Sequence, residues 1–392
     1  MVKISFSCES VIQQIELFQR ADRTNWSSWK RIHYRAVINW LDKYEPPKNA
    51  SNLEQVRGSL EAIYHLCELN EWRGCEVILS APAQKIANTK YALYQQLEIW
   101  GHYSEQLEIY SRLVNRDNIL ASLNLLALIG LSNVYGHLSN YSSAISFAKQ
   151  ALEKSSEINN MQGKSNALTS LGNACGGIGK FKQAFIYFQD SLKIAEKENL
   201  IPEKARALKG LGNVCGNRRQ YSQAISYLEQ CRDLAFQIGD RVLEAQAVSN
   251  LGNANGYLKN YAKATDYFQQ YLATSRELQN PSGEAIALNC LGELHRRTKQ
   301  YDQAISCLEQ SLSTARDTKE RVSEGIALGN LGSVYGYMGD YTQAIDYHRK
   351  ALKITQSISD RPGIFLARVN LTLTYLALWL SRIWQMLAQR RS

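Results

Sequence analysis

The triplet Leu-Gly-Asn occurs three times at a constant spacing, as Leu171-Gly172-Asn173, Leu211-Gly212-Asn213 and Leu251-Gly252-Asn253. The spacing is 40 residues, and the leucine of this register recurs at Leu131, Leu291, Leu331 and Leu371. A fixed period of this length is typical of stacked copies of one supersecondary unit. The sequence therefore predicts a repeat protein in which each copy packs against its neighbours.

Each copy has the pattern of two helices joined by a turn. Ala167, Leu168, Leu171 and Gly172 have the spacing of one helical face, and the same residue types return 40 positions later. The second half of each copy opens with an aromatic residue and has alanine three positions on. The aromatic residues are Tyr141, Phe181, Tyr221, Tyr261, Tyr301 and Tyr341, and the alanines are Ala144, Ala184, Ala224, Ala264, Ala304 and Ala344. We expect these alanines to let the second helix approach the glycine column of the first.

These columns, with Ala151 and Ala351 closing two of the second helices, resemble the tetratricopeptide repeat. The 40-residue length and the Leu-Gly-Asn triplet resemble in particular the extended repeats of bacterial multi-repeat proteins and of animal spindle-orientation scaffolds of the Pins type. The resemblance covers about residues 123–362. It implies an all-α fold, a right-handed α-solenoid of tandem helix-turn-helix repeats. For function it implies a docking scaffold that serves many partners.

The regular array divides the chain into four predicted parts. Residues 121–362 hold six tandem repeats, and residues 52–120 hold degenerate helical hairpins. Residues 1–51 form an N-terminal helical cap, in which Trp26, Trp29 and Trp40 share one face as a core or, alternatively, as a partner-docking surface. Residues 363–392 form a degenerate repeat or a capping helix with a basic tail.

Catalytic motifs are missing from the sequence. It has no nucleophile elbow, no paired-carboxylate motif and no dinucleotide fingerprint, and its six histidines lack the spacing of zinc ligands. We therefore expect no enzyme, no cofactor and no metal. Cys175 and Cys215 occupy a core column, which indicates small apolar side chains in a reducing compartment. With no secretory signal recognised, we expect a cytoplasmic protein.

The resemblance implies that the first helices line a concave groove. Its columns are those of Asn166, Thr169, Asn173, Gly176 and Gly177 with their equivalents 40 residues away. One column forms an amide ladder of Asn133, Asn173, Asn213 and Asn253. Amides both donate and accept hydrogen bonds, so this ladder is a candidate for holding a peptide backbone. The alternative is that the asparagines solvate the surface or bond within the repeat.

Cationic residues on the same helices are further candidates. Lys209, Asn213 and Asn253 resemble part of the carboxylate clamp of some tetratricopeptide co-chaperones, but Asn289 and Glu293 replace its remaining basic members. Binding of an acidic chaperone tail is therefore not expected. The groove still has cationic groups suited to a carboxylate, and these are Arg206, Arg296 and Arg297.

A second glycine column lies near the end of the first helices. Its members are Gly136, Gly176, Gly216, Gly256 and Gly336. Each helical glycine costs about 0.5–1 kcal/mol relative to alanine, so the column needs a reason. One interpretation is a groove floor that a ligand backbone approaches closely. The other is fraying or tight packing before the turn.

Charge is concentrated at the C-terminal end. The chain has a net charge of +9, and residues 361–392 contain five arginines and no acidic residue. Val369 to Ser381 is an uncharged stretch of 13 residues, shorter than the roughly 20 that span a bilayer. We expect a capping helix that buries Trp379 and Trp384. The alternative is a membrane anchor, with Trp379, Ile383, Trp384 and Leu387 as its apolar face and Arg382, Arg390 and Arg391 as its charges.

Basic residues at the turns, Lys180, Arg219, Lys259 and Lys299, are interpreted as a solvated edge, and no specific nucleic-acid partner is expected. The sequence thus favours a non-catalytic scaffold or adaptor that binds a peptide segment or helix of a protein partner in the concave groove. Two alternatives are an assembly factor for a membrane protein complex, acting through the C-terminal segment, and a ligand-responsive regulatory sensor.

Overall fold

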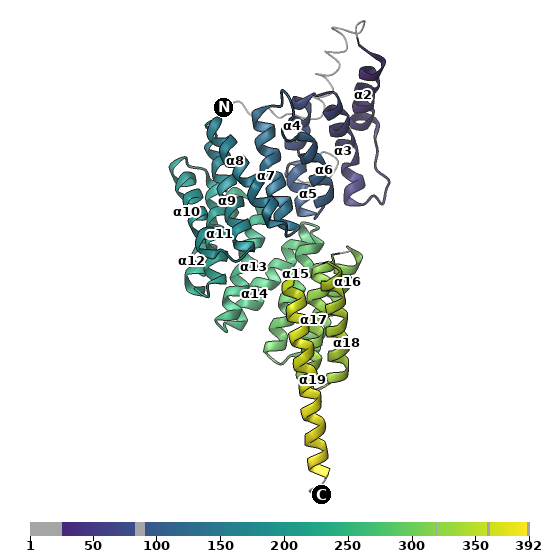
Figure 1. Ribbon diagram of the computed structural model, residues 1–392, viewed down its shortest axis with the longest axis vertical. Coiled ribbons are helices and arrows are strands. Elements are labelled where there is room, and N and C mark those ends of the chain that lie inside the picture. The colour runs from purple at the N-terminus through teal and green to yellow at the C-terminus, as the bar shows by residue number, and fades with distance from the viewer. Residues whose placement is uncertain (1–25, 83–90, 319, 359–360, 390–392) are drawn as a thin grey trace. The chain divides into compact units, whose positions relative to one another are not determined.

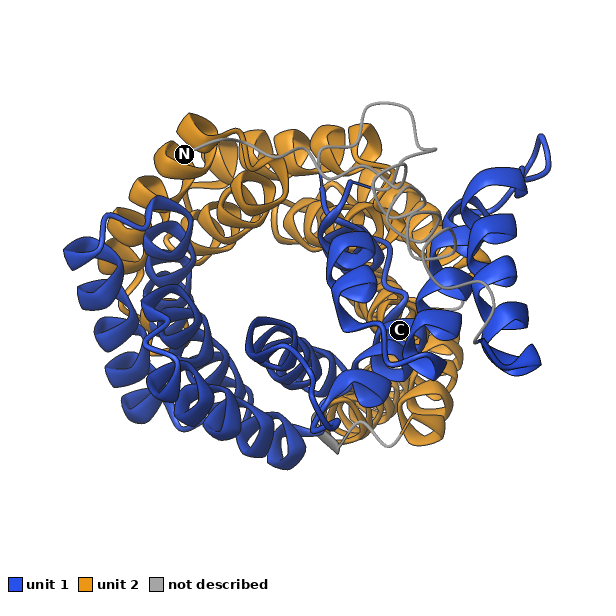
Figure 2. Cartoon of the chain, turned by 90° about the horizontal axis from the view of Figure 1, so that it is seen from above, with its two compact units in different colours: residues 1–214 blue, residues 215–392 orange. Residues whose placement is uncertain are grey.

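The computed structural model describes residues 26–82, 91–318, 320–358 and 361–389. Over these residues the chain forms 18 α-helices and one short π-helix, with no β-strand (Figure 1). The predicted all-α class is therefore confirmed. The helices belong to two compact units, residues 1–214 and residues 215–392, in each of which they stand side by side in a curved row (Figure 2).

The described N-terminal helices are less regular than those that follow, and all of them except α3 are shorter. They are α2 Ser28–Ile38, π-helix η1 Asn39–Lys43, α3 Asn52–Glu68, α4 Trp72–Ser80, α5 Leu93–Ile99 and α6 Tyr103–Leu113. Trp26 is buried and stacks on Tyr34 with ring centroids 4.5 Å apart, whereas Trp29 is 50% exposed. The expectation that Trp26, Trp29 and Trp40 share one core is therefore wrong for Trp29. Helices expected before residue 26 lie outside the described residues.

Twelve helices follow in regular succession. The first helices of the pairs are α7 Ala121–His137, α9 Met161–Gly177, α11 Ile201–Asn217, α13 Arg241–Tyr257, α15 Pro281–Arg297 and α17 Arg321–Met338. The second helices are α8 Tyr141–Glu157, α10 Phe181–Lys197, α12 Tyr221–Ile238, α14 Tyr261–Glu277, α16 Tyr301–Asp317 and α18 Tyr341–Ser357. The boundary between the two units falls within α11. Helix packing therefore follows the 40-residue period seen in the sequence.

The glycine of the Leu-Gly-Asn triplet lies against a large side chain of the second helix, not against the expected alanine. A Cβ added to Gly172 would lie 2.7 Å from the Phe188 ring, and one added to Gly252 would lie 2.7 Å from the Phe268 ring. Ala184, the expected partner, is fully buried four residues earlier. The second helix inserts a ring over the first, and glycine leaves the room for it.

Each first helix is followed, one or two residues after its end, by a residue with left-handed backbone. These residues are Ser139, Gly179, Arg219, Lys259, Lys299 and Gly339, with φ between 58° and 88°. Polar residues and glycine tolerate this conformation better than bulky apolar ones do. The seventh member of this column is Trp379, flanked by Leu378 and Leu380, and there the helix does not end. Helix α19 Arg361–Gln389 runs on for 29 residues as a result.

Helix α19 packs on α18 and α17 with one side only. Ala367 and Thr374 are buried, and Arg349 of α18 donates a hydrogen bond to the Tyr375 hydroxyl. Trp379 is 59% exposed and Trp384 is 71% exposed, so the expected burial of both tryptophans in a cap is wrong. Among the described helices, the part of α19 from Gly363 to Met386 is the one long and apolar enough to cross a membrane, judged by length and composition only.

Candidate functional site

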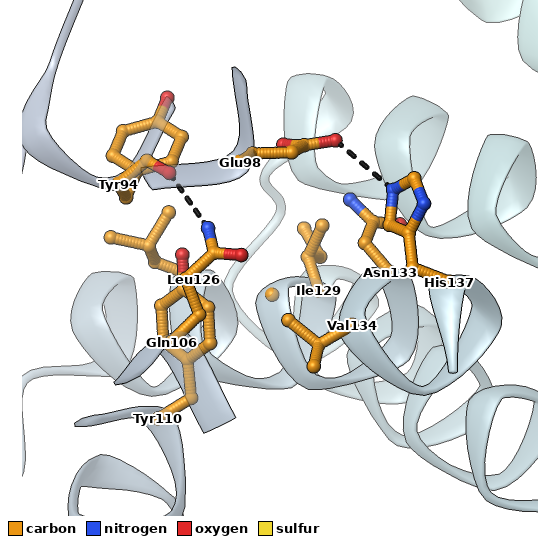
Figure 3. A pocket seen from close by; sticks show the side chains of 10 residues that line it. Tyr94, Glu98, Gln106, Tyr110, Leu126, Ile129, Asn133, Val134 and His137 are labelled. Atoms are coloured by element: carbon orange, nitrogen blue, oxygen red, sulfur yellow. Dashed lines mark hydrogen bonds and ion pairs between the residues drawn. The ribbon is translucent and has the colours of Figure 1, made fainter. Parts of the chain in front are cut away.

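In unit 1, the first helices bring charged side chains together beside a small pocket. Glu98 of α5 and His137 of α7 approach to 3.5 Å between Oε1 and Nε2 (Figure 3). The pocket has a volume of about 50 Å³, room for a few waters or one small polar group. Its lining comes from α5, α6 and α7 and consists of Tyr94, Glu98, Gln106, Tyr110, Leu126, Ile129, Gly130, Asn133, Val134 and His137.

The polar atoms of this pocket favour a hydrogen-bond donor. Gln106 is buried, and its Nε2 donates to the carbonyl oxygen of Tyr94 at 2.7 Å (Figure 3). The Gln106 Oε1 is buried without a hydrogen-bond partner among the described residues. With the carboxylate of Glu98 nearby, the pocket presents acceptor oxygens to any group that enters it.

Two predicted cationic residues, Arg206 and Lys209 of α11, lie near this pocket. Burial alone would raise the pKa of Glu98, but the hydrogen bond from His137 and the positive charges of His137, Lys209 and Arg206 outweigh it and hold that pKa below its usual value. Arg206 is also 3.2 Å from the buried carboxylate of Glu203. The two residues are therefore part of a charge network that connects α11 with α5.

The asparagines of the ladder differ in exposure and in hydrogen bonding. The Asn133 Oδ1 accepts a hydrogen bond from Ser170 of the next first helix at 2.8 Å, so this amide bonds within the array. Asn173 is exposed and Asn213 is half-buried, both in unit 1. Asn253 is exposed in unit 2. Ligand contact by the ladder stays a prediction. Asn173 and Asn253 are the members best suited to it, because they are exposed.

In unit 2, the predicted Arg296 and Arg297 share one carboxylate. Arg296 binds Glu293 in a two-pronged pair, with Nε to Oε2 at 2.7 Å and Nη2 to Oε1 at 2.6 Å. Arg297 Nε donates to the same Glu293 Oε1 at 2.8 Å. Glu293, the residue that breaks the carboxylate-clamp pattern, thus occupies both guanidinium groups. Two cations and one anion leave this group with a single positive charge.

Two exposed tyrosines of the neighbouring first helices flank these arginines. The Arg296 guanidinium lies 4.6 Å from the Tyr337 ring centre, and that of Arg297 lies 5.5 Å from the Tyr257 ring centre. Tyr337 is 67% exposed and Tyr257 is 58% exposed. We name Tyr257, Glu293, Arg296, Arg297 and Tyr337 together the Tyr–Arg cluster.

Sequence reasoning missed the tyrosines of this cluster. Tyr257, Arg297 and Tyr337 stand 40 residues apart in the column of Gly177, which the resemblance already placed on the groove. That alternation of aromatic and arginine was the signal that could have found them.

Burial raises the pKa of Glu293, but its bonds to Arg296 and Arg297 outweigh burial and lower that pKa overall.

The second glycine column is not explained by tight packing. A Cβ added to Gly136, Gly176 or Gly216 would meet nothing within 4 Å. At Gly256 and Gly336 it would make only ordinary contact with an alanine, at 3.9 Å and 3.8 Å. The packing interpretation is therefore wrong for this column, which leaves fraying at the helix end or an open groove floor.

The described residues contain no group of histidine, cysteine and acidic side chains that could hold a metal ion. His65 forms a hydrogen bond with His33, with 3.0 Å between their Nδ1 atoms. The sulfur atoms of Cys67 and Cys75 lie 3.8 Å apart. Cys175 and Cys215 are buried as predicted, and burial raises the pKa of both thiols.

Comparison with known proteins agrees with this architecture. No curated protein sequence matches the chain. A crystal structure of a Rap protein complexed with competence and sporulation factor is 14% identical, with a TM-score of 0.54 over 95% of this chain and 98% of that one. The Rap conjugation gene regulator of plasmid pLS20, in complex with a Phr peptide, is 11% identical, with a TM-score of 0.56 over 91% and 92%. At these identities the likeness concerns the fold.

A third similar structure is a signal transduction ATPase with a tetratricopeptide repeat sensor from Pyrococcus horikoshii. It is 17% identical, with a TM-score of 0.50 over 89% of this chain and 56% of that one. The family model of the tetratricopeptide repeat matches residues 127–197, 203–277 and 283–377, which is more than half of the chain. The chain belongs to the tetratricopeptide repeat family.

Proposed function

We propose that this protein is a non-catalytic scaffold that binds a peptide segment of a partner protein on the face formed by its first helices. The observation that carries the proposal is the Tyr–Arg cluster of unit 2. Its two tyrosine rings expose more than half of their surface, although large aromatic side chains gain free energy from burial. Tyrosine and arginine, with tryptophan, are also enriched at the energetic centres of protein interfaces.

The charged groups of the cluster are held in place before a ligand arrives. Glu293 fixes both guanidinium groups, and each of these lies against a tyrosine ring. Binding therefore has little side-chain freedom left to remove from the arginines, which favours affinity. The single excess positive charge favours a segment that has at least one carboxylate beside its apolar side chains.

Apolar side chains extend the same face along the first helices. Ile286 of α15 is 40% exposed and Ile326 of α17 is 49% exposed, and both stand in the groove column of Asn166. They lie seven and eleven residues before Glu293 and Tyr337, which is the spacing of one helical face. We infer a binding surface on α13, α15 and α17 with apolar contacts at one end and the Tyr–Arg cluster at the other. The Rap conjugation gene regulator of plasmid pLS20, which has a similar fold and was solved in complex with a Phr peptide, supports the choice of ligand class.

The experiment begins with selection of linear peptides on the full-length protein from a random library. The affinity of the selected peptides is then compared between the wild type and the double variant Tyr257→Ala/Tyr337→Ala. Loss of two interface anchors is expected to weaken binding by about tenfold or more. The control is Phe236→Ala, because Phe236 is a 72% exposed aromatic residue on a second helix of the same unit.

Unchanged affinity in the double variant, or equal losses in the double variant and in Phe236→Ala, would contradict the assignment of the binding face. Circular dichroism of each variant distinguishes loss of a peptide contact from loss of the fold. Because both tyrosines are exposed, their removal should leave the helix content unchanged. Failure to select any peptide would count against peptide binding itself.

A further inference from the structure

Helix α19 carries a largely apolar surface, interrupted by the exposed Arg368 and Thr372, that the rest of unit 2 leaves mostly uncovered. Nine large apolar side chains along it are at least 40% exposed, and they are Phe365, Leu366, Leu373, Tyr375, Leu376, Trp379, Leu380, Trp384 and Met386. At 100° per residue these positions span about half of the helix circumference. The buried Ala367 and Thr374 lie on the opposite side, toward α18.

The charge of the segment argues against a second copy of this chain. Residues 361–392 contain Arg361, Arg368, Arg382, Arg390 and Arg391 and no aspartate or glutamate. Two such segments packed together would bring only like charges to each other, which disfavours pairing. An anionic lipid surface supplies the missing negative charge, and each basic residue near such a surface contributes about 1 kcal/mol to binding.

The dimensions fit a bilayer interface better than a full span. The first half of α19 is held against α18, and its C-terminal part extends beyond α17 and α18 (Figure 1). The segment from Ala377 to the end of the helix at Gln389 is about 20 Å long at 1.5 Å per residue, less than the roughly 30 Å of a hydrocarbon core. Trp379 and Trp384 lie in this part, and tryptophan is enriched at the level of the lipid headgroups.

We propose that the C-terminal part of α19, residues 377–389, docks the protein on an anionic phospholipid membrane. In this arrangement Trp379, Leu380, Ile383 and Trp384 enter the interface between headgroups and acyl chains, and Arg382 meets lipid phosphates. The peptide-binding face on the first helices of unit 2 plays no part in this docking, so the two properties are separable.

Co-sedimentation of the full-length protein with lipid vesicles tests the proposal. The probes are phosphatidylcholine vesicles with and without phosphatidylglycerol, compared at low and high salt. The wild type is expected to bind the anionic vesicles, to bind them less as salt rises because the charges are screened, and to show a blue shift of tryptophan emission on binding. The double variant Trp379→Ala/Trp384→Ala is expected to lose at least about tenfold in vesicle partitioning.

The control variant Phe236→Ala removes an equally exposed aromatic residue from α12 and should bind vesicles as the wild type does. Thermal unfolding of both variants should match that of the wild type, because the removed side chains are exposed. Absence of wild-type binding to anionic vesicles would overturn the proposal, as would full binding by the double variant. Concentration-dependent dimerisation that the double variant loses, without vesicle binding by the wild type, would assign the surface to a second copy instead.

Discussion

His348 occupies a position that other repeats fill with an apolar side chain. The equivalent residues are Phe188, Leu228, Phe268 and Leu308, all buried. His348 is itself buried against Gly332, and its Nδ1 has no hydrogen-bond partner among the described residues. Burial lowers the pKa of this imidazole to about 4. The folded protein therefore keeps His348 neutral at a pH where the unfolded chain protonates it.

This residue makes stability depend on pH in a defined direction. Between the ordinary histidine pKa and about 4, the unfolded state binds more protons, so the unfolding free energy falls as pH is lowered through this range. His348→Phe is expected to raise the unfolding free energy by about 1–3 kcal/mol near pH 5, and by less near pH 8. Urea denaturation at both pH values measures the difference. A gain that does not grow toward low pH would contradict the assignment.

Glu293 is a charged group whose substitution is expected to have the opposite effect on stability. Its pKa is lowered in the folded state, so its stabilising effect is present above the ordinary pKa and is lost as pH falls through the folded value. Glu293→Gln is expected to lower the unfolding free energy near pH 7 by about 1 kcal/mol, since the carboxylate is partly exposed. The difference between wild type and variant should shrink as the pH is lowered below 4.5, the value from which the Glu293 pKa is lowered. A difference that stays constant with pH would exclude the carboxylate as its cause.

Two glycines of α9 have different surroundings, one packed against a side chain and the other facing open space. Gly172 has the Phe188 ring where a side chain would be, whereas Gly176 has open space. Gly172→Ala is therefore expected to destabilise the protein by about 1–3 kcal/mol through overpacking. Gly176→Ala is expected to stabilise it by about 0.5 kcal/mol through helix propensity. Chemical denaturation of the two variants measures both signs, and a loss at Gly176 comparable to that at Gly172 would contradict the open surface.

The sequence pattern predicts helices better than it predicts their contacts. The 40-residue period sufficed for the helical hairpins, because leucine, glycine and alanine columns constrain which faces are buried. It did not reveal that Gly172 packs against Phe188 and not against Ala184, because Phe188 and Ala184 lie on one face of the second helix. Nor did it reveal that Glu293 binds Arg296 and Arg297 together, which depends on side-chain conformation. Trp379 stands where the earlier repeats have a turn residue, and helix α19 continues through this position.

At the scale of the molecule, repeats that contact mainly their neighbours predict stability that is distributed along the array. Deletion of residues 241–280, one helix pair of unit 2, removes one copy and lets the flanking copies meet in register. The shortened protein is expected to stay helical and to melt at a lower temperature, as measured by circular dichroism. It should also lose affinity for selected peptides, because Tyr257 is deleted. Complete unfolding at low temperature would contradict a repeat array with neighbour contacts.

The claim that the first helices of unit 2 bind a peptide is tested most directly by hydrogen–deuterium exchange of the full-length protein with and without a selected peptide. Slower exchange is predicted in the C-terminal halves of α13, α15 and α17, which contain the Tyr–Arg cluster, with little change in α14, α16 and α18. Protection confined to the second helices or to α19, with α13, α15 and α17 unchanged, would contradict the proposed binding face.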